Sequence, residues 1–166
     1  MAMTSSGPAT ITLPTDEQIL ITREFDAPKH LVYKAWTTPE LVKRFWGKNM
    51  SVVEIDLRVG GQWRYVMTAD AGFEVAFHGE FREIVPDERI VTTEVYEMPD
   101  APPLPAADEP LNIVTFTETD GRTTLELLVQ TTSRELRDTI MSSGMEAGMQ
   151  EQMDRLEELA ASLRSG

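Results

Sequence analysis

Side chains that could take part in acid–base chemistry are few in this sequence and lie far apart. The two histidines are His30 and His78. Because side chains alternate along a strand, a strand that turns Phe77 inward turns His78 outward, and we expect His78 at the surface. A buried Tyr65 or Tyr96 could polarise a carbonyl group. These residues do not form an identifiable catalytic constellation, so we assign no catalytic residue and favour a protein that is not an enzyme.

Arg64 and Glu80 are the charged residues best placed to meet on neighbouring strands of the predicted sheet. Such a pair could transfer a proton or could simply form a cross-strand ion pair, and we favour the ion pair. Metal binding would require converging His, Cys or carboxylate ligands, and the sequence has no Cys and only two distant His. The serines at Ser142 and Ser143 precede Gly144 without the flanking glycine of a nucleophile elbow. We therefore expect neither a metal nor a cofactor.

Net charge restricts the class of partner. The chain of 166 residues has 28 acidic and 15 basic side chains, a formal charge of −13. Nucleic acids and anionic lipids are bound mainly through Lys and Arg, so we expect neither as a partner. No run of about 18 apolar residues is present, which argues against a membrane span.

The length predicts one domain with a substantial core. We expect residues 1–15 to form a flexible tail and residues 16–164 to form the single domain. The tail has no Lys or Arg and no apolar segment behind it, unlike a signal peptide, and we expect a cytoplasmic protein.

Periodicity and turn residues predict one strand, two short helices, six strands and a C-terminal helix. Pro28 and Pro39 suit the first turns of the two short helices, with Asp26 as the cap of the first. Asp120–Gly121 predicts a two-residue hairpin turn. Thr132 and Glu135 have the spacing of a capping box, and Gly144 predicts a break before the last long helix. The predicted strands are 18–25, 51–58, 62–68, 73–84, 89–97, 111–118 and 122–131.

The segment Met98–Pro110 contains five prolines and cannot pair into a sheet. It is predicted to be an extended loop, either a lid over a cavity or a tolerated insertion.

The order of several short motifs resembles a known family. Phe25–Pro28, Ala35–Leu41, Phe45–Gly47 and Asp56–Gly61 resemble the SRPBCC or START-like (Bet v 1-like) superfamily, and more narrowly the C-terminal domain of activators of heat-shock protein 90 ATPase. The resemblance implies an α+β helix-grip fold. In that fold a six- to seven-stranded curved antiparallel sheet wraps around a long C-terminal helix, with two short helices after the first strand.

The resemblance also implies a binding cavity between the sheet and the C-terminal helix. Strand alternation, the end of the second helix and the methionine spacing of the last helix select the lining residues. The same residues equally describe an ordinary packed core. The expected lining is Phe45, Trp46, Trp63, Tyr65, Met67, Val75, Phe77, Phe81, Val114, Phe116, Leu127, Met145, Met149 and Met153.

Three functions remain open. The first, which we favour, is binding of a hydrophobic or amphipathic small molecule in this cleft. The second is a co-chaperone-like module that interacts with a heat-shock protein 90 homologue, and the third is a cyclase- or hydrolase-type enzyme on the same scaffold. We expect a monomer or homodimer.

Overall fold

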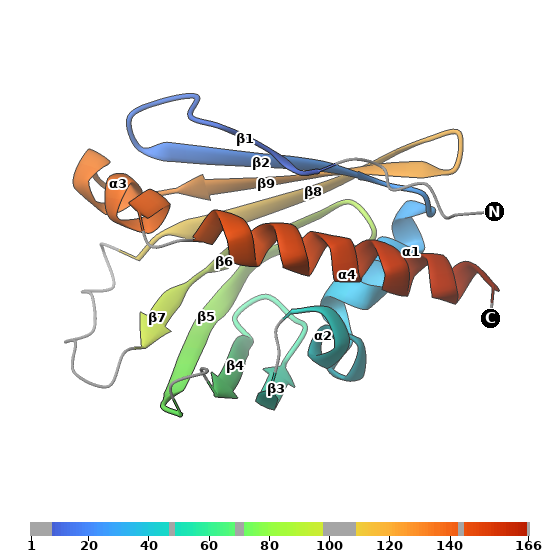
Figure 1. Ribbon diagram of the computed structural model, residues 1–166, viewed down its shortest axis with the longest axis horizontal. Coiled ribbons are helices and arrows are strands. Elements are labelled where there is room, and N and C mark those ends of the chain that lie inside the picture. Colours follow the sequence, from blue (N-terminus) through green and yellow to red (C-terminus); the bar gives the residue numbers. More distant parts are fainter. Residues whose placement is uncertain (1–7, 47–48, 69–71, 98–108, 143–144, 166) are drawn as a thin grey trace.

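The strands of the protein form one curved antiparallel sheet. The computed structural model describes residues 8–46, 49–68, 72–97, 109–142 and 145–165 (Figure 1). Within these residues nine strands are arranged in the order β1-β2-β9-β8-β6-β5-β4-β3, with β7 also paired to β5. The strands are β1 (Thr10–Thr12), β2 (Gln18–Phe25), β3 (Met50–Ile55), β4 (Gln62–Thr68), β5 (Glu74–Val85), β6 (Arg89–Thr93), β7 (Val95–Glu97), β8 (Leu111–Thr119) and β9 (Arg122–Gln130).

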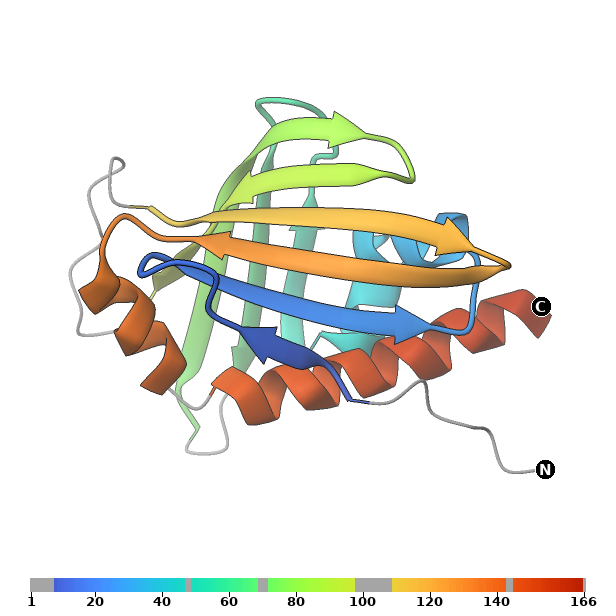
Figure 2. The ribbon, with the colours of Figure 1, turned by 90° about the horizontal axis from the view of Figure 1, so that it is seen from above.

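The sheet wraps around the C-terminal helix. The helices are α1 (Lys29–Thr37), α2 (Pro39–Phe45), α3 (Arg134–Ser142) and α4 (Met145–Ser165). In Figure 1 the strands β2, β9 and β8 lie above α4 and β3 and β4 lie below it, and Figure 2 shows the same curvature from above. This is the helix-grip arrangement that the sequence predicts. No helix in the described part of the chain is long and apolar enough to cross a membrane.

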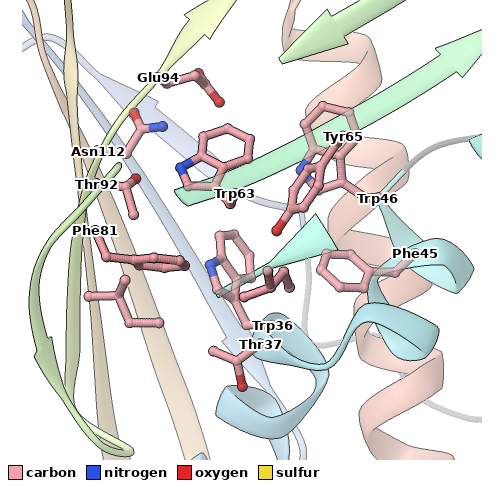
Figure 3. A pocket seen from close by; sticks show the side chains of 12 residues that line it. Trp36, Thr37, Phe45, Trp46, Trp63, Tyr65, Phe81, Thr92, Glu94 and Asn112 are labelled. Carbon is pink, nitrogen blue, oxygen red and sulfur yellow. The ribbon is translucent and has the colours of Figure 1, made fainter. Parts of the chain in front are cut away.

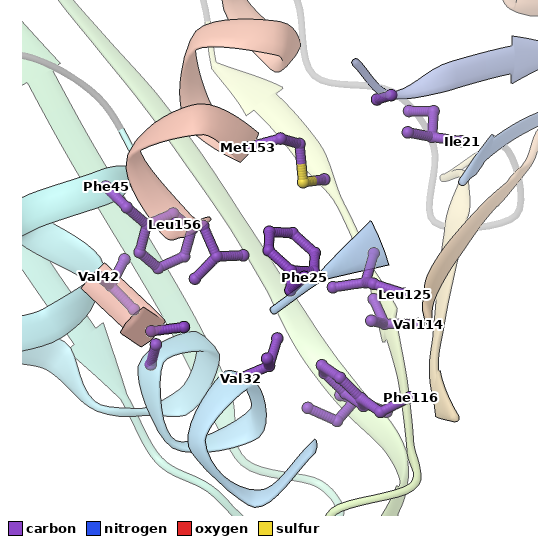
Figure 4. Close-up of a cluster of buried hydrophobic side chains, with 14 of the residues drawn as sticks. Ile21, Phe25, Val32, Val42, Phe45, Val114, Phe116, Leu125, Met153 and Leu156 are labelled. Atoms are coloured by element: carbon purple, nitrogen blue, oxygen red, sulfur yellow. The ribbon is translucent and has the colours of Figure 1, made fainter. Parts of the chain in front are cut away.

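One apolar core joins the sheet, α1, α2 and α4 (Figure 4). Met153 and Leu156 of α4 face Phe25 of β2 and Leu125 of β9, and all four side chains are almost fully buried. Burying such side chains stabilises the fold by roughly 1.5–3 kcal/mol each. The long helix is therefore held by its own apolar stripe.

A buried ion pair adds to this contact between sheet and helix. The fully buried Arg23 of β2 donates from Nη2 to Glu157 Oε1 at 2.8 Å and from Nη1 to Asp154 Oδ1 at 2.9 Å. Arg23 follows Ile19 and Ile21 on the inward face of its strand. A charge at this position requires its two carboxylate partners on α4, because an unpaired buried charge is costly.

The N-terminal segment is more ordered than the sequence indicated. Thr10–Thr12, expected in the tail, pair with Leu20–Thr22 as strand β1. Gln150 of α4 exchanges two hydrogen bonds with the backbone of Ala9, at 2.9 and 2.8 Å. These contacts hold the start of the edge strand against α4. Residues 1–7 lie outside the described part of the chain.

Two predicted helix caps are wrong. The N-cap of α1 is Pro28, without a side-chain hydrogen bond, and Asp26 instead accepts hydrogen bonds from Arg164. At the start of α3, Ser133 Oγ accepts from the Leu136 N–H at 3.1 Å, in place of Thr132. In each case the capping site lies one or two residues after the one that the spacing indicated.

The Asp120–Gly121 turn is confirmed. Both residues have positive φ, 53° and 77°, as a two-residue primed turn requires. The predicted strand 89–97 divides at Glu94 into β6 and β7, which together with β1 explains why the sheet has more strands than expected. Of the proline-rich segment Met98–Pro110, residues 98–108 lie outside the described part of the chain. The predicted break before α4 falls on 143–144, which lie outside it too.

Candidate functional site

A pocket opens between the concave face of the sheet and the two short helices. Figure 3 shows its walls, which carry aromatic side chains from α1, α2, β4 and β5 and polar side chains from β6 to β8. Its volume is about 60 Å³, which is room for only a few water molecules. We call it the aromatic pocket. It is lined by Trp36, Thr37, Phe45, Trp46, Ile55, Trp63, Tyr65, Phe81, Ile90, Thr92, Glu94 and Asn112.

The two short helices place aromatic residues over the sheet. Pro39 starts α2 directly after α1 ends, and α2 buries Val42 and Phe45 on one side. The Trp36 and Phe45 rings lie 5.8 Å apart, and Trp46, which follows α2, meets Tyr65 of β4 edge-on at 5.1 Å. All three tryptophans of the chain line the pocket.

Trp63 forms part of the inner wall. Its register partner on β5 is Gly79, and the missing side chain of that glycine leaves room for the indole. Trp63 is 6% exposed, and its Nε1 has no hydrogen-bond partner among the described residues. A buried N–H group without an acceptor is unfavourable, by roughly 1–3 kcal/mol.

The polar end of the pocket comes from β6 and β8. Thr92 and Asn112 are register partners, and Glu94 lies two residues beyond Thr92 on the same face. At Glu94 the strand is interrupted, and its backbone N–H donates to the Pro110 carbonyl at 3.1 Å. Asn112 Oδ1 is buried and has no partner in the described structure.

Burial alters the acidity of two groups in this pocket. Desolvation raises the pKa of the Glu94 carboxyl, and a hydrogen bond from the Asn112 side chain partly opposes this rise. Desolvation, and then the nearby charge of Glu94, raise the pKa of the Tyr65 hydroxyl. The site therefore favours uncharged forms of both groups. A carboxyl group with a raised pKa can donate a hydrogen bond or a proton to a bound molecule.

A row of aromatic rings leads from the pocket toward the surface. Phe77 lies between Trp46 and Tyr96, with ring centroids 4.8 and 4.7 Å away, and Tyr96 is 47% exposed. Tyr65, Phe77 and Tyr96 are successive register partners across β4, β5 and β7. We call Trp46, Tyr65, Phe77 and Tyr96 the aromatic shelf.

The predicted lining residues divide between the pocket and the core. Phe45, Trp46, Trp63, Tyr65 and Phe81 line the pocket, and Phe77 belongs to the shelf. Val75 is buried and Met67 is partly buried on the same two strands. The side chain of Met145 lies outside the described part of the structure. The main core contains Val114, Phe116, Met149 and Met153, with Leu127 packed against it.

The position of the pocket therefore differs from the expected cleft. Met149 and Met153, 6% and 1% exposed, fill the space between α4 and the sheet. None of the described residues of α4 lines the aromatic pocket, whose cover is α1 and α2 instead. The two short helices cover the aromatic pocket because their aromatic side chains pack against the concave face of the sheet at β4 and β5.

Sequence reasoning missed the polar end. Ile90, Thr92 and Glu94 are alternate residues that all face inward. The acidic Glu94 in this inward-facing series is the sequence signal that indicates the polar end. Asn112 precedes the predicted inward residue Val114 by two positions and gives the same signal. Trp36 also lines the pocket and is absent from the lining that the sequence predicts.

The outer face of the sheet carries an ordinary charge cluster. The predicted Arg64–Glu80 pair is wrong, since the register places Arg64 opposite His78. Arg64 Nε lies 3.6 Å from Glu97 Oε2, and His78 Nδ1 lies 2.7 Å from the same oxygen. Glu80 pairs with Arg82. Within the described residues no three His, Asp or Glu side chains converge as a metal site.

Comparison with known proteins identifies the family and the fold. A family model for "Activator of Hsp90 ATPase homolog 1-like protein" matches residues 26–161. Protein Ms6760 from Mycobacterium smegmatis is 25% identical, with a TM-score of 0.80 over 92% of this chain and 96% of its own. Protein CV1439 from Chromobacterium violaceum is 25% identical, with a TM-score of 0.69 over 86% and 96%.

A protein from Rhodobacter sphaeroides, 23% identical, shares the fold with a TM-score of 0.81 over 93% of this chain and 99% of its own. No curated protein matches the sequence. The architecture of sheet, short helices and C-terminal helix is thus common to proteins from several bacteria.

Proposed function

This chain belongs to the family of Activator of Hsp90 ATPase homolog 1-like proteins, and within that fold we propose that it binds a hydrophobic or amphipathic small molecule in the aromatic pocket. The fold commonly serves either ligand binding or a co-chaperone-like role. We favour ligand binding because of the aromatic and polar side chains that line this pocket.

The observation that supports ligand binding is a pocket that joins aromatic walls to one polar end. Trp63 and Asn112 both line this pocket, and their atoms Nε1 and Oδ1 are buried without partners among the described residues. Native proteins hydrogen-bond nearly all such groups, because each unsatisfied one is destabilising. Aromatic walls with a few polar groups at one end are typical of sites that bind small molecules.

The shelf supports an amphipathic ligand of moderate length. The pocket volume of about 60 Å³ is far below the roughly 300–1,000 Å³ typical of sites that enclose a drug-sized molecule. We therefore expect the ligand to place one end in the pocket and to lie along Phe77 and Tyr96 with the rest. Aromatic rings favour such flat or apolar bodies.

Binding of an Hsp90 homologue has support only from the description of the family, and a catalytic role has support only from the raised pKa of Glu94. Among the described residues we identify neither a contact surface for a protein partner nor a second catalytic group beside Glu94. Hsp90 binding and catalysis are therefore the alternatives against which the experiment tests ligand binding.

Indole signals provide the test. Since the three tryptophans all line the pocket, the three indole N–H signals of the ¹⁵N-labelled protein report on this site alone. We expect the neutral amphipathic dye Nile red to shift the Trp46 and Trp63 signals in a saturable, one-to-one manner. Native mass spectrometry of protein purified from its own source should show a co-purified molecule. Unchanged indole signals together with an empty protein would contradict ligand binding and favour the protein-partner role.

A further inference from the structure

Glu94 is the one charged side chain among the described residues that line the aromatic pocket. It is partly exposed, and Figure 3 shows its carboxyl group pointing from the strand toward the side of Trp63. The Asn112 amide donates a hydrogen bond to this carboxyl, and Figure 3 shows the amide nitrogen, not the oxygen, on that side. The carboxyl group therefore has a fixed place at the polar end of the pocket, where a bound molecule can contact it.

Aromatic rings form a large part of the remaining wall. The ring centroids of Trp63 and Tyr65 lie 4.7 Å apart at an interplanar angle of 52°, and those of Trp46 and Tyr65 lie 5.1 Å apart at 70°. Rings at such angles form adjoining walls rather than a stack. Trp36, Trp46 and Tyr65 are partly exposed, which leaves part of each ring open to contact. The face of an aromatic ring is negative and attracts cations, most strongly in Trp.

Positive charge is absent from the described lining of the pocket. None of these residues is Lys, Arg or His, so the lining offers Glu94 no cationic partner. The whole chain has a formal charge of −13, and a protein of this charge attracts cations from solution. The carboxylate of Glu94, the ring faces and the net charge thus all favour a positively charged ligand.

We propose that the ligand carries a methylated ammonium group, which lies among the aromatic rings of the pocket with Glu94 as its counter-charge. This inference rests on the proposed binding of a small molecule in the aromatic pocket. It narrows the ligand from any hydrophobic or amphipathic molecule to an organic cation whose apolar part lies on the aromatic shelf. The pocket volume of about 60 Å³ suits a small head group of this kind.

Other head groups match the lining less well. A carboxylate or a phosphate would meet the like charge of Glu94 and the negative faces of the rings. A neutral head group would gain nothing from either charge. An unmethylated ammonium has three N–H donors that need acceptors, whereas the methyl groups of a quaternary ammonium contact the rings directly.

Ionisation of Glu94 makes this binding depend on pH. Desolvation raises the pKa of its carboxyl, so the empty pocket favours the neutral form. A bound cation stabilises the ionised form and lowers the pKa again, with release of a proton. The affinity for a cation should therefore rise with pH until the pH exceeds the raised pKa of the free protein. Tyr65, the other titratable lining residue, has a raised pKa and stays neutral, and His78 lies in the charge cluster on the outer face.

Choline and 3,3-dimethylbutan-1-ol provide the test, because they have the same shape and differ by a quaternary nitrogen in place of a carbon. Dissociation constants are measured from the indole N–H shifts at pH 5 to 8. We expect choline to bind about tenfold more tightly than the alcohol at pH 8 and about threefold more tightly at pH 5, where Glu94 is protonated. The affinity of the alcohol should not change with pH. Ethanolamine, the unmethylated counterpart, should bind more weakly than choline.

Two variants assign the effect to particular residues. Glu94→Gln keeps the side-chain size and removes the charge, so the preference for choline should stay at about threefold at every pH. Trp46→Leu removes one ring but keeps an apolar side chain, so choline should bind about fivefold more weakly and the alcohol about twofold or less. Glu158→Gln, at an exposed position of α4, is the charge-matched control and should leave both affinities unchanged. Circular dichroism establishes that the variants are folded.

Several results would overturn the proposal. Equal affinities of choline and the alcohol would exclude a cationic head group, and tighter binding of ethanolamine would exclude a methylated one. A choline preference that responds neither to pH nor to Glu94→Gln would remove Glu94 as the counter-charge. Binding of Nile red without binding of choline would refute the cationic head group while leaving ligand binding intact. Failure of all four molecules to shift the indole signals would refute the proposed function itself.

Discussion

The indole Nε1 of Trp63 lies 2.7 Å from the point that a Cβ atom on Gly79 would occupy. The two residues are register partners on β4 and β5, so the glycine provides the space in which the tryptophan lies against the sheet. The shape of the pocket wall thus depends on a residue that has no side chain. An aromatic ring over a strand glycine also shields the exposed backbone of that strand.

Gly79→Ala should therefore destabilise the protein. The new Cβ would lie 1.8 Å from the Thr93 carbonyl oxygen as well as against Trp63, so strand and indole must both shift. We expect a loss of roughly 1–3 kcal/mol or more in urea unfolding, together with a displaced Trp63 indole signal. Gly148→Ala is the control: it adds a Cβ in open space on α4 and should stabilise by about 0.5–1 kcal/mol. Equal effects of the two changes would refute the packing argument.

The acidity of Glu94 predicts how stability changes with pH. Because its pKa is raised in the folded protein, the folded state binds the proton more tightly than the unfolded state. Its contribution to stability is complete below the ordinary pKa of a glutamate and is lost as the pH rises toward the raised value. The group that faces it with a second raised pKa is Tyr65, which is neutral throughout this range.

Glu94→Gln should remove this loss and stabilise the protein above that window. Urea unfolding at a series of pH values from 4 to 9 measures the effect. Glu158→Gln, at an exposed position of α4, serves as the charge-matched control. A wild type and a Glu94→Gln variant with parallel pH profiles would show that the carboxyl is not desolvated.

The buried Arg23 predicts a strong effect of breaking one partner and a weak effect of removing the pair. Arg23→Ala leaves Glu157, which is 6% exposed, without its guanidinium and should cost roughly 3–5 kcal/mol. Arg23→Met combined with Glu157→Leu should recover most of that loss. Arg164→Ala, which breaks the exposed contact with Asp26, should cost about 1 kcal/mol or less. Thermal unfolding measures all three, and additive losses in the double variant would contradict a coupled pair.

The exposed end of the aromatic shelf predicts a change in affinity without a change in fold. Tyr96→Ala removes a ring that is 47% exposed, so stability should fall by about 0.5 kcal/mol or less. Binding of Nile red should weaken about fivefold, because one aromatic contact is lost. Leu13→Ala, also exposed but outside the shelf, should leave the affinity unchanged. Equal affinities in both variants would show that the ligand does not reach the shelf.

Met149→Ala should have the opposite effect to Tyr96→Ala, a loss of stability without a loss of affinity. Met149 packs in the core between α4 and the sheet and does not line the pocket. The substitution should cost roughly 2–5 kcal/mol of stability while the folded protein keeps its affinity for Nile red. A large loss of affinity would place the ligand against α4, in the cleft that the sequence suggested.

Local signals in the sequence were sufficient for most elements. Pro39 marks the start of α2, Asp120–Gly121 marks the β8–β9 hairpin, and strand alternation places Trp63, Tyr65 and Phe81 inward. Each of these features depends on a few neighbouring residues and on backbone sterics, so the sequence alone determines it. The order of such features was also enough to predict the helix-grip fold.

Only the tertiary structure decided where the cavity lies and what its polar end contains. Glu94 and Asn112 come from strands whose side chains converge with Trp63 only because the sheet curves, and β1 forms only because β2 and α4 provide partners for residues 9–12. Met149 and Met153, which the sequence allowed as either core or lining, are core because α4 packs close to the sheet. Contacts between residues distant in the chain depend on the curvature of the whole sheet, and no local pattern in the sequence specifies that curvature.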